Sequence, residues 1–408
     1  GVQGVAKTKQ EWMSFTRFQL VKLDKSEVVD PDPEPQPEPA IADGTYYLYN
    51  EAGKVFFERG GVYGTQAVVG KYGLPVDITT VNGVTTLAMH DWAGTVIGFD
   101  EGIYADASGE NARTYTVKTV EGGFVFVNNN NYALTIVDGA VNGVLDGEGT
   151  VWAVKTLEER NAILEAAVAA DKSAAFAAVG YPEDAEFETT DCTEQVASAS
   201  LAGSIEGWTW TEVRKPEAFA TNVNGTECYK GTGTLSQTVT GLEQGLYRVT
   251  VNGLYRDGWN ANQVTMAADG YYNSTAYLAA NGVQAQITPW AKDRVADGNP
   301  NSMADYKAII SEDATKYLSE LYTTVGEDGE MAISINVPSF IDGGWCIFSN
   351  VTLTRLSYTA PEPEPEPQPV VADGTYYIKN VATGKYLAGG SWWGTHAVVK
   401  DYGLDIAV

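Results

Sequence analysis

The segment Asp257-Gly-Trp-Asn-Ala-Asn262 has the residue types that a sugar-binding site needs. Sugars are held by an exposed aromatic face that contacts C–H groups, with polar side chains around it for the hydroxyls. Trp259 fits the first role. The same residues also fit a loop tryptophan that closes over the edge of a core, with asparagines that satisfy the turn backbone, and we favour this second interpretation. The candidate sugar-binding residues in this region are Trp259, Asp257, Asn260, Asn262, Tyr271, Tyr272 and Trp290.

A second aromatic candidate is Trp393, in the pair Trp392-Trp393. Adjacent residues of a strand point to opposite faces, so we expect one tryptophan in a core and the other exposed. The internal copy described below has Val62-Tyr63 at these positions, so a site here would differ between the copies.

Metal binding and catalysis have less support. Asp297-Gly-Asn-Pro-Asn301 begins like a calcium loop, but Ala308 stands where the bidentate glutamate belongs, and a turn before a helix cap at Ser302 explains the segment better. The chain has two histidines, and His396 is replaced by Gln66 in the other copy, so no essential chemistry of a repeated unit depends on it. Serine-hydrolase, zinc-protease and phosphate-loop motifs are absent from the sequence. A glycosidase with paired carboxylates stays open among so many acids, but we expect no enzyme.

Charge and cysteine content limit the partners. The 53 acidic and 26 basic residues give a net charge of -27, which disfavours nucleic acid as a partner because phosphate binding needs clustered Lys and Arg. Cys192, Cys228 and Cys346 cannot all pair and form no zinc-ribbon spacing, although one bond between two of them stays open. The sequence has no run of about 18 apolar residues, so we expect no membrane insertion in this segment.

The chain contains two proline-glutamate spacers and an internal repeat. Alternating prolines at 29–39 and 361–369 predict stiff polyproline II rods. After each spacer comes the same motif, Ala42-Asp-Gly-Thr-Tyr-Tyr-Leu48 and Ala372-Asp-Gly-Thr-Tyr-Tyr-Ile378, 330 residues apart. Before each spacer, Trp12–Leu23 aligns with Trp345–Leu356. We therefore expect the chain to be a window on a repeat of about 330 residues, opening on the last strand of one domain and closing inside another.

Short alternating runs between Gly, Asn and Asp predict strands and few helices. Thr156-Leu-Glu-Glu159 predicts a capping box that opens a helix to about Ala170, and Ser302 with Asp305 predicts a second helix to Leu321. The strands predicted between 42 and 154 are Thr45–Tyr49, Val55–Glu58, Val84–Met89, Gly102–Ala105, Thr114–Lys118, Phe124–Val127, Leu134–Val137 and Trp152–Val154, and those beyond 184 include Gly233–Val239 and Tyr247–Tyr255.

The motif Asp43-Gly-Thr-Tyr-Tyr-Leu-Tyr-Asn50 and its copy at 373–380 resemble the first strands of ricin-type β-trefoil lectin domains, a likeness that spans 42–155. That family has three repeats of four strands, and its sugar sites usually contain a Gln-x-Trp motif. Here the closing strand has Thr150-Val-Trp152, without the glutamine. The literal Gln10-Glu-Trp12 aligns with the terminal strand of the other domain.

Residues 185–358 resemble galactose-binding-like jelly rolls of surface proteins and polysaccharide-degrading enzymes from gut anaerobic bacteria. The residues that carry this likeness are Gly207-Trp208, Tyr229–Gln237, Gly245–Val249, Tyr255-Arg-Asp-Gly258 and Trp345–Leu356. In the resembled family calcium is common in the jelly roll, so the resemblance leaves calcium open as a ligand.

Together these observations predict an all-β, multidomain chain: a β-trefoil and a β-sandwich jelly roll with a short helical connector, joined by Pro-Glu linkers. The expected parts are a terminal jelly-roll strand (1–24), a linker (25–41), a β-trefoil (42–155), a helical connector (156–183), a jelly roll (184–358), a linker (359–371) and the first part of the next β-trefoil (372–408).

The expected function is that of a non-catalytic, extracellular tandem-repeat protein of a bacterial surface, an adhesive or structural array whose partners are glycans or neighbouring copies. A ragged start on a terminal strand also permits strand donation between chains. The alternative is an accessory glycan-binding region of a polysaccharide-degrading enzyme.

Overall fold

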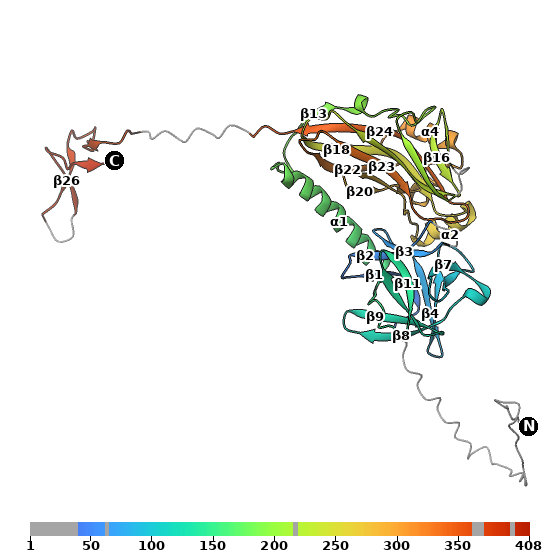
Figure 1. Cartoon of the computed structure of the whole chain (residues 1–408). Helices are drawn as coiled ribbons and strands as arrows, with labels where there is room; N and C mark the ends of the chain where they lie inside the picture. Colours follow the sequence, from blue (N-terminus) through green and yellow to red (C-terminus); the bar gives the residue numbers. More distant parts are fainter. Residues whose placement is uncertain (1–39, 62–64, 215–218, 361–370, 392–395) are drawn as a thin grey trace, which may run out of the picture. The chain divides into compact units, whose positions relative to one another are not determined.

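The computed structural model describes residues 40–61, 65–214, 219–360, 371–391 and 396–408. It is mainly β, with 45% strand and 14% helix, in several sheets (Figure 1). Two compact units, Gly1–Tyr358 and Thr359–Val408, make up the chain, and each is described by itself. The predicted strand at Trp12–Leu23, Gln10-Glu-Trp12 and Trp393 lie outside the described residues. The predicted domain boundaries within the first unit stay predictions.

The first part of unit 1, here called the barrel (residues 40–155), is a closed sheet of nine strands. Two-residue hairpins set its registers: Asn82-Gly83 and Asp138-Gly139 have positive φ, as such tight turns require. The ring runs β1 (Gly44–Asn50), β2 (Val55–Arg59), β3 (Ala67–Gly70), β11 (Ala140–Leu145), β10 (Tyr132–Val137), β9 (Gly123–Asn128), β8 (Tyr115–Val120), β5 (Val84–Met89) and β4 (Val76–Val81), which returns to β1.

Three short strands extend the ring to a sheet of twelve: β6 (Val96–Gly98), β7 (Tyr104–Ala107) and β12 (Ala153–Lys155). The eight strands predicted from sequence are confirmed within a few residues, and β3, β4, β6 and β11 were not predicted. The interior is apolar because alternate residues of the strands point inward. Its fully buried members include Leu48, Phe57, Leu74, Leu87, Phe126, Leu134 and Trp152.

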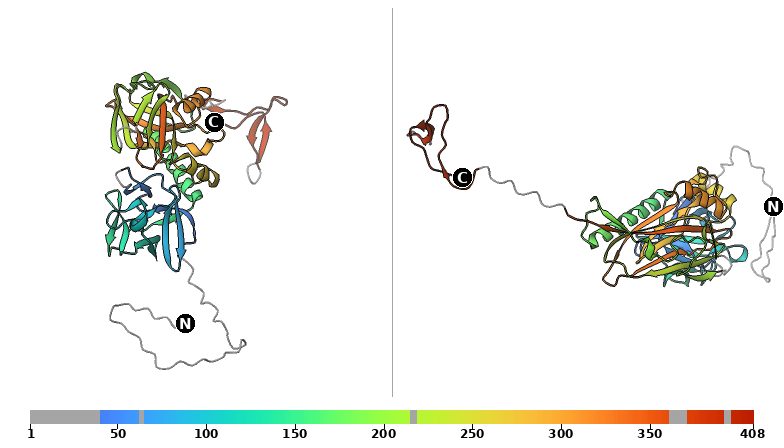
Figure 2. Two further views of the ribbon diagram at one scale, coloured as in Figure 1. Left: turned by 90° about the vertical axis from the view of Figure 1, so that its right-hand side faces the viewer. Right: turned by 90° about the horizontal axis from the view of Figure 1, so that it is seen from above.

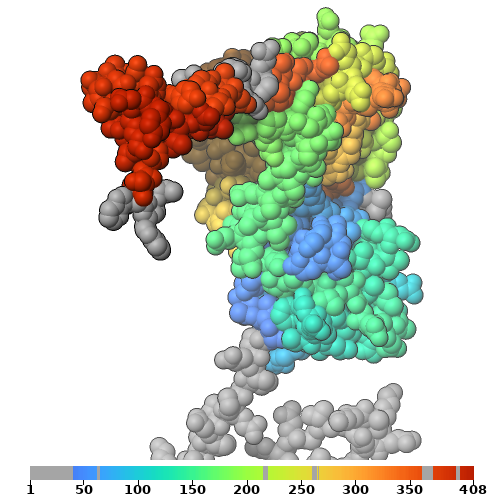
Figure 3. All heavy atoms as spheres, turned by 90° about the vertical axis from the view of Figure 1, so that its left-hand side faces the viewer, coloured from blue at the N-terminus to red at the C-terminus, as the bar shows by residue number. Residues whose placement is uncertain are grey.

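Helix α1 (Leu157–Ala178) follows the barrel and begins at the predicted capping box. The Thr156 hydroxyl accepts from the Glu159 amide at 3.2 Å, and the Glu159 carboxylate accepts from the Thr156 amide at 2.8 Å. The predicted end near Ala170 is wrong, because the helix-forming sequence continues and its last turns bury Phe176 against Leu246 and Leu356. In Figure 3 the green residues of α1 lie on the surface that faces the viewer.

The second part of unit 1, here called the second module (residues 188–358), consists of two sheets around one core (Figure 2). Val249 and Phe348 of one sheet and Leu235 and Ile335 of the other are fully buried in that core. The larger sheet contains β13 (Glu188–Asp191), β15 (Phe219–Asn222), β16 (Gly225–Tyr229), β18 (Gly245–Arg256), β21 (Thr288–Pro289), β22 (Leu318–Val325) and β24 (Trp345–Ser357), and the smaller one β14 (Thr209–Arg214), β17 (Thr232–Val239), β19 (Tyr277–Ala280), β20 (Val283–Gln286) and β23 (Met331–Val337).

Three α-helices lie in the described part of the second module: α2 (Asn260–Asp269), α3 (Trp290–Asp293) and α4 (Met303–Glu312). The Ser302 cap of α4 is confirmed, because its hydroxyl accepts from the Asp305 amide at 3.1 Å. The predicted helix to Leu321 is wrong. Residues 318–325 alternate between exposed and buried side chains, the pattern of a strand, and pair with β18 as β22. Helix α2 begins in the segment that was predicted to be a loop.

The barrel and the second module contact each other through backbone and buried charge. The Phe340 amide donates to the Gly60 carbonyl at 3.1 Å, and the Thr232 hydroxyl donates to the Gly61 carbonyl at 3.1 Å. The completely buried Arg59–Asp91 ion pair of the barrel interacts with Asp257 of the second module. The two parts are therefore joined directly as well as through α1.

The second unit reproduces the strand pairing of the first part of the barrel. Its strands are β25 (Thr375–Tyr376), β26 (Tyr386–Gly389), β27 (Ala397–Lys400) and β28 (Ile406–Ala407). The pair Tyr376 and Ile406 corresponds to Tyr46 and Val76, and the pair Tyr386 and Lys400 to Phe56 and Gly70, each shifted by 330 residues. These strands thus pair in the same registers in both copies of the motif.

Candidate functional site

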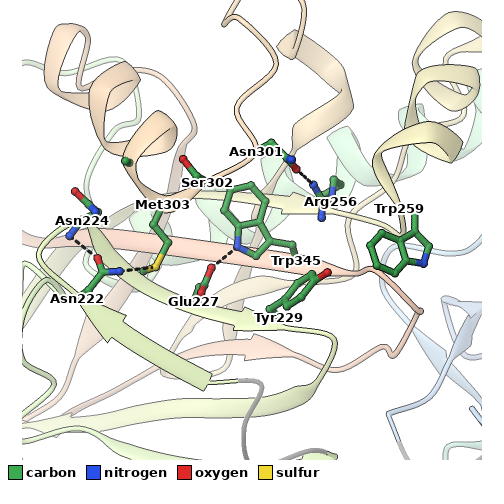
Figure 4. Close-up of a pocket in the computed structure, with 11 residues that line it drawn as sticks. Asn222, Asn224, Glu227, Tyr229, Arg256, Trp259, Asn301, Ser302, Met303 and Trp345 are labelled. Carbon is green, nitrogen blue, oxygen red and sulfur yellow. Dashed lines mark hydrogen bonds between the residues drawn. The ribbon is translucent and has the colours of Figure 1, made fainter.

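The ends of three neighbouring strands in the larger sheet bring aromatic and charged side chains together. Tyr229 at the end of β16 is paired with Trp345 at the start of β24, and Trp345 is paired with Arg256 at the end of β18. Directly opposed residues of antiparallel strands point to the same face, so these three side chains form a row. The row is the floor of a cavity of about 560 Å³ (Figure 4).

The walls of this cavity, here called the Trp345 cavity, come from separate elements. Trp259 immediately precedes the first residue of α2, while Asn301 and Ser302 precede α4. The size is within the range of small-molecule sites in proteins. The lining residues are Asn222, Asn224, Glu227, Tyr229, Arg256, Trp259, Asn301, Ser302, Met303, Ala304 and Trp345.

Hydrogen bonds hold the polar groups of the Trp345 cavity in place. The indole of Trp345 donates to Glu227 Oε2 at 2.6 Å, and the Asn222 side chain donates to the Met303 sulfur at 2.9 Å. Arg256 donates to the side-chain oxygen of Asn301. Fixed side chains lose little conformational entropy when a ligand binds, which favours affinity.

Two aromatic rings at the Trp345 cavity are exposed, Trp259 to 44% and Tyr229 to 38%. The Trp259 indole donates to Asp342 Oδ2 at 2.8 Å, and the Lys230 ammonium lies 3.9 Å from the centre of the Trp259 ring. Lys230 also forms an ion pair with Asp342 at 3.3 Å. A sugar stacked on that ring face would have to move the flexible lysine side chain, whereas Tyr229 lies 5.5 Å from the same ammonium.

Four predicted site residues lie elsewhere. Asp257 is 1% exposed, beside Arg59 and Asp91 of the barrel, so it is a junction residue and not a polar neighbour of Trp259. Trp290 is completely buried, and its indole donates to the Pro300 carbonyl at 2.7 Å. These two predictions are corrected because both side chains belong to the interior.

Tyr271 and Tyr272 also have partners away from the Trp345 cavity. The Tyr271 hydroxyl donates to the Thr45 carbonyl of the barrel at 3.2 Å, and its ring stacks 6.4 Å from Tyr47. Tyr272 packs on the cluster around Trp290. Asn260 and Asn262 lie in α2, and their side chains are outside the described residues, as is Trp393.

Sequence reasoning missed Tyr229, Arg256, Glu227, Asn301 and Trp345 as site residues. Tyr229, Arg256 and Trp345 lie at strand ends far apart in the sequence, and only their register brings them together. The available signal was the position of Tyr229 before Gly231 and of Trp345 after Gly344, where a strand meets a turn.

The calcium-like segment is a turn whose oxygens contact basic side chains. Asp297 accepts from the Lys316 ammonium at 2.9 Å, and Asn299 accepts from Arg294. Within the described ranges, no group of three or more His, Cys, Asp or Glu could hold a metal ion. All three cysteines are free and buried, so the one disulfide left open by the sequence is not formed. No helix in the described part of the chain is long and apolar enough to cross a membrane.

Comparison with known proteins gives distant structural similarities. No protein-family model and no curated protein matches the chain. Among solved structures, it is similar to TmCBM61 in complex with β-1,4-galactotriose, at 14% identity over 45% of this chain and 96% of that one, with a TM-score of 0.19. It is also similar to an exo-β-1,3-galactanase from Phanerochaete chrysosporium with galactose, at 10% identity over 76% of this chain and 65% of that one, with a TM-score of 0.18.

Proposed function

We propose that this chain is a non-catalytic, glycan-binding part of an extracellular tandem-repeat protein on a bacterial surface, and that the Trp345 cavity is its sugar site. The observation that carries the proposal is the cavity itself: two exposed aromatic rings, Trp259 and Tyr229, stand beside fixed polar groups in a space of about 560 Å³. Aromatic faces with convergent hydrogen-bonding groups are what recognition of a sugar requires.

We propose that the two parts of unit 1 each match a more specific fold. We take the barrel to be a β-trefoil, because its sheet has twelve strands, the number that three repeats of four strands require. We take the second module to be a galactose-binding-like jelly roll, with two sheets around one core. Under this assignment the cavity lies at the strand ends of the jelly roll, where connecting segments supply variable side chains.

Binding of the whole chain to a glycan array, followed by titration calorimetry with each positive sugar, tests the proposal. Trp259→Ala and Tyr229→Ala should each weaken binding at least tenfold, because each removes a ring face from the ligand. Tyr402→Ala is the matched control, since Tyr402 is a 64% exposed tyrosine of the second unit. Binding that survives both cavity substitutions would place the site elsewhere, and the absence of any glycan ligand would refute the function.

A structural array is the second candidate function, and the second unit favours it. Its strands pair in the same registers as the first strands of the barrel, 330 residues earlier. A strand arrangement that recurs along the chain suits a protein built from modules in series. Ordered fibres in electron micrographs without glycan binding would support this function over the first.

A further inference from the structure

We propose, on the basis of the proposed glycan-binding function, that the sugar held by the Trp345 cavity carries an acidic group, the carboxylate of a uronic acid, and that Arg256 binds this group. The inference goes beyond sugar binding as such, because it selects the chemical class of the ligand. It rests on the environment of one guanidinium group.

Arg256 is a buried cation whose hydrogen-bond partners are all neutral. The residue is 5% exposed. Its Nε donates to the Gly258 carbonyl at 3.2 Å, Nη2 donates to the Gly343 carbonyl at 3.3 Å, and Nη1 donates to the side-chain oxygen of Asn301. A guanidinium has five N–H donors, so one remains on each terminal nitrogen. Two parallel N–H groups match the two oxygens of a carboxylate.

Arg59 and Arg113 have the carboxylate partner that this guanidinium lacks, whereas Arg160, also 5% exposed, donates to neutral oxygens as Arg256 does. The completely buried Arg59 donates to both oxygens of Asp91, at 2.9 and 2.6 Å, and Arg113 donates to both oxygens of Asp100. Among the described residues, no carboxylate forms an ion pair with Arg256. A buried charge without a counter-ion is costly, and that cost falls when a ligand supplies the opposite charge.

The electrostatics at Arg256 agree with this reading. Burial lowers the pKa of Arg256, and the nearby Tyr229 phenol acts in the opposite direction. The guanidinium also lies 5.4 Å from the centre of the Trp345 ring, which supports the cation from one side. A ligand carboxylate would therefore meet a cation already oriented by a ring and three hydrogen bonds.

The Trp345 cavity also has an end suited to the uncharged part of such a sugar. Glu227 and Asn222 lie on the other side of Trp345 from Arg256 in Figure 4. Glu227 already accepts from Trp345 through one oxygen, and its remaining capacity suits a sugar hydroxyl. The carboxylate and the hydroxyls of one acidic sugar would thus bind at opposite ends. The net charge of -27 is spread over the chain and screened beyond about 8–10 Å, so the local guanidinium decides the contact.

Titration calorimetry of the whole chain with trigalacturonate and with its methyl ester tests the inference, because the two ligands differ only in charge and a small methyl group. The wild-type chain should bind the acid roughly 10- to 100-fold more tightly than the ester. Galactose 6-sulfate is a third probe, and preference for it over trigalacturonate would assign the anion to a sulfate ester instead of a carboxylate.

Variants connect the preference to Arg256. Arg256→Gln should bind acid and ester equally, whereas Trp259→Ala should weaken both and keep their ratio. If Arg256→Gln does not fold, Arg256→Lys decides, because it keeps the charge, loses the two-pronged geometry and should reduce the ratio. The inference is overturned, with sugar binding left intact, if the wild type binds acid and ester equally. It is also overturned if Arg256→Gln still prefers the acid over the ester. Failure to bind any glycan would instead refute the proposed function as well.

Discussion

Replacing Asp257 with asparagine should stabilise the protein at neutral pH. Asp257 lies at the contact between the barrel and the second module, 1% exposed, where the Tyr255 hydroxyl donates to its Oδ1 at 3.3 Å. Burial raises the pKa of Asp257 well above its usual range, and the negative charge of Asp91 raises it further, against the opposing effect of Arg59. The folded protein therefore keeps a proton on Asp257 that the unfolded chain releases.

The sign and size of the effect follow from that proton. Above the ordinary pKa of about 3.9, the unfolded state loses the proton and the folded state retains it, so the free energy of unfolding falls by about 1.4 kcal/mol per pH unit until the raised pKa is reached. Asparagine imitates the protonated acid and does not titrate. The advantage of Asp257→Asn should thus grow with pH, by roughly 3 to 6 °C in melting temperature per unit at 2 to 4 °C per kcal/mol.

Melting temperatures of the wild type and the variant from about pH 4 to pH 8 test this, with Asp91→Asn as the matched control. Asp91→Asn makes the same chemical change in the same cluster but removes the bidentate partner of Arg59, so it should destabilise the folded protein. The loss should be at most about 3–5 kcal/mol, because Asp257 can ionise beside Arg59 in place of Asp91. Two results would show that Asp257 is ionised in the folded protein. One is a melting-temperature difference between Asp257→Asn and wild type that does not change with pH, and the other is a loss of stability of Asp257→Asn at neutral pH.

Three further predictions concern His90, the α1 cap and the thiols. His90 contacts Asp77 at 2.9 Å, Asp269 at 3.1 Å and the Tyr271 ring, and the hydrogen bond with Asp77 raises the pKa of His90. The protonated imidazole therefore stabilises the folded protein below about pH 6.5, and this stabilisation is lost as the pH rises through the raised pKa. His90→Gln should therefore lower the melting temperature more in acid than in alkaline buffer, and equal losses would contradict this. Thr156→Ala should cost about 1 kcal/mol in urea unfolding through loss of the cap, whereas Ser173→Ala inside the same helix should cost little. Burial raises the pKa of Cys228 to about 12 and that of Cys346 well above its usual range, so a thiol reagent should modify neither before unfolding. Reaction of both thiols with the reagent in the folded protein would argue against the packed core.

Sequence patterns correctly predicted the helix starts and strands that depend on neighbouring residues in the chain. The capping box fixed the start of α1, and period-two alternation located most strands of the barrel. The ends of the helices were not predictable in this way. The last turns of α1 are stabilised by packing of Phe176 on the second module, which is a contact distant in the sequence. Helix α4 ends at Glu312 because the chain from Leu318 onward pairs with β18 as a strand. This pairing partner is distant in the sequence, so a helical pattern does not reveal it.

The site was predicted less completely because its residues are neighbours only through strand register. Trp259 was identified by composition, and the structure places it at the Trp345 cavity. Asp257, two residues away, was assigned to the same site, but it points to the barrel. Both residues follow the end of β18 at Arg256, where strand alternation no longer sets the direction of a side chain, so the sequence alone does not say which of them is exposed.

The two copies of the barrel's first strands separate the residues that set the fold from those that set the module contact. The hairpins β2–β3 and β26–β27 have the same register, and Leu74 and Leu404 make the same backbone hydrogen bond to the residue at 57 or 387. At the positions of Glu58 and Arg59, however, the second copy has Ala388 and Gly389. Glu58 accepts from the amides of Tyr72 and Gly73, and Arg59 carries the buried charge at the junction, so neither is needed for the strand pairing. The shared positions therefore determine strand pairing, while contact with the second module depends on side chains that the second copy does not have.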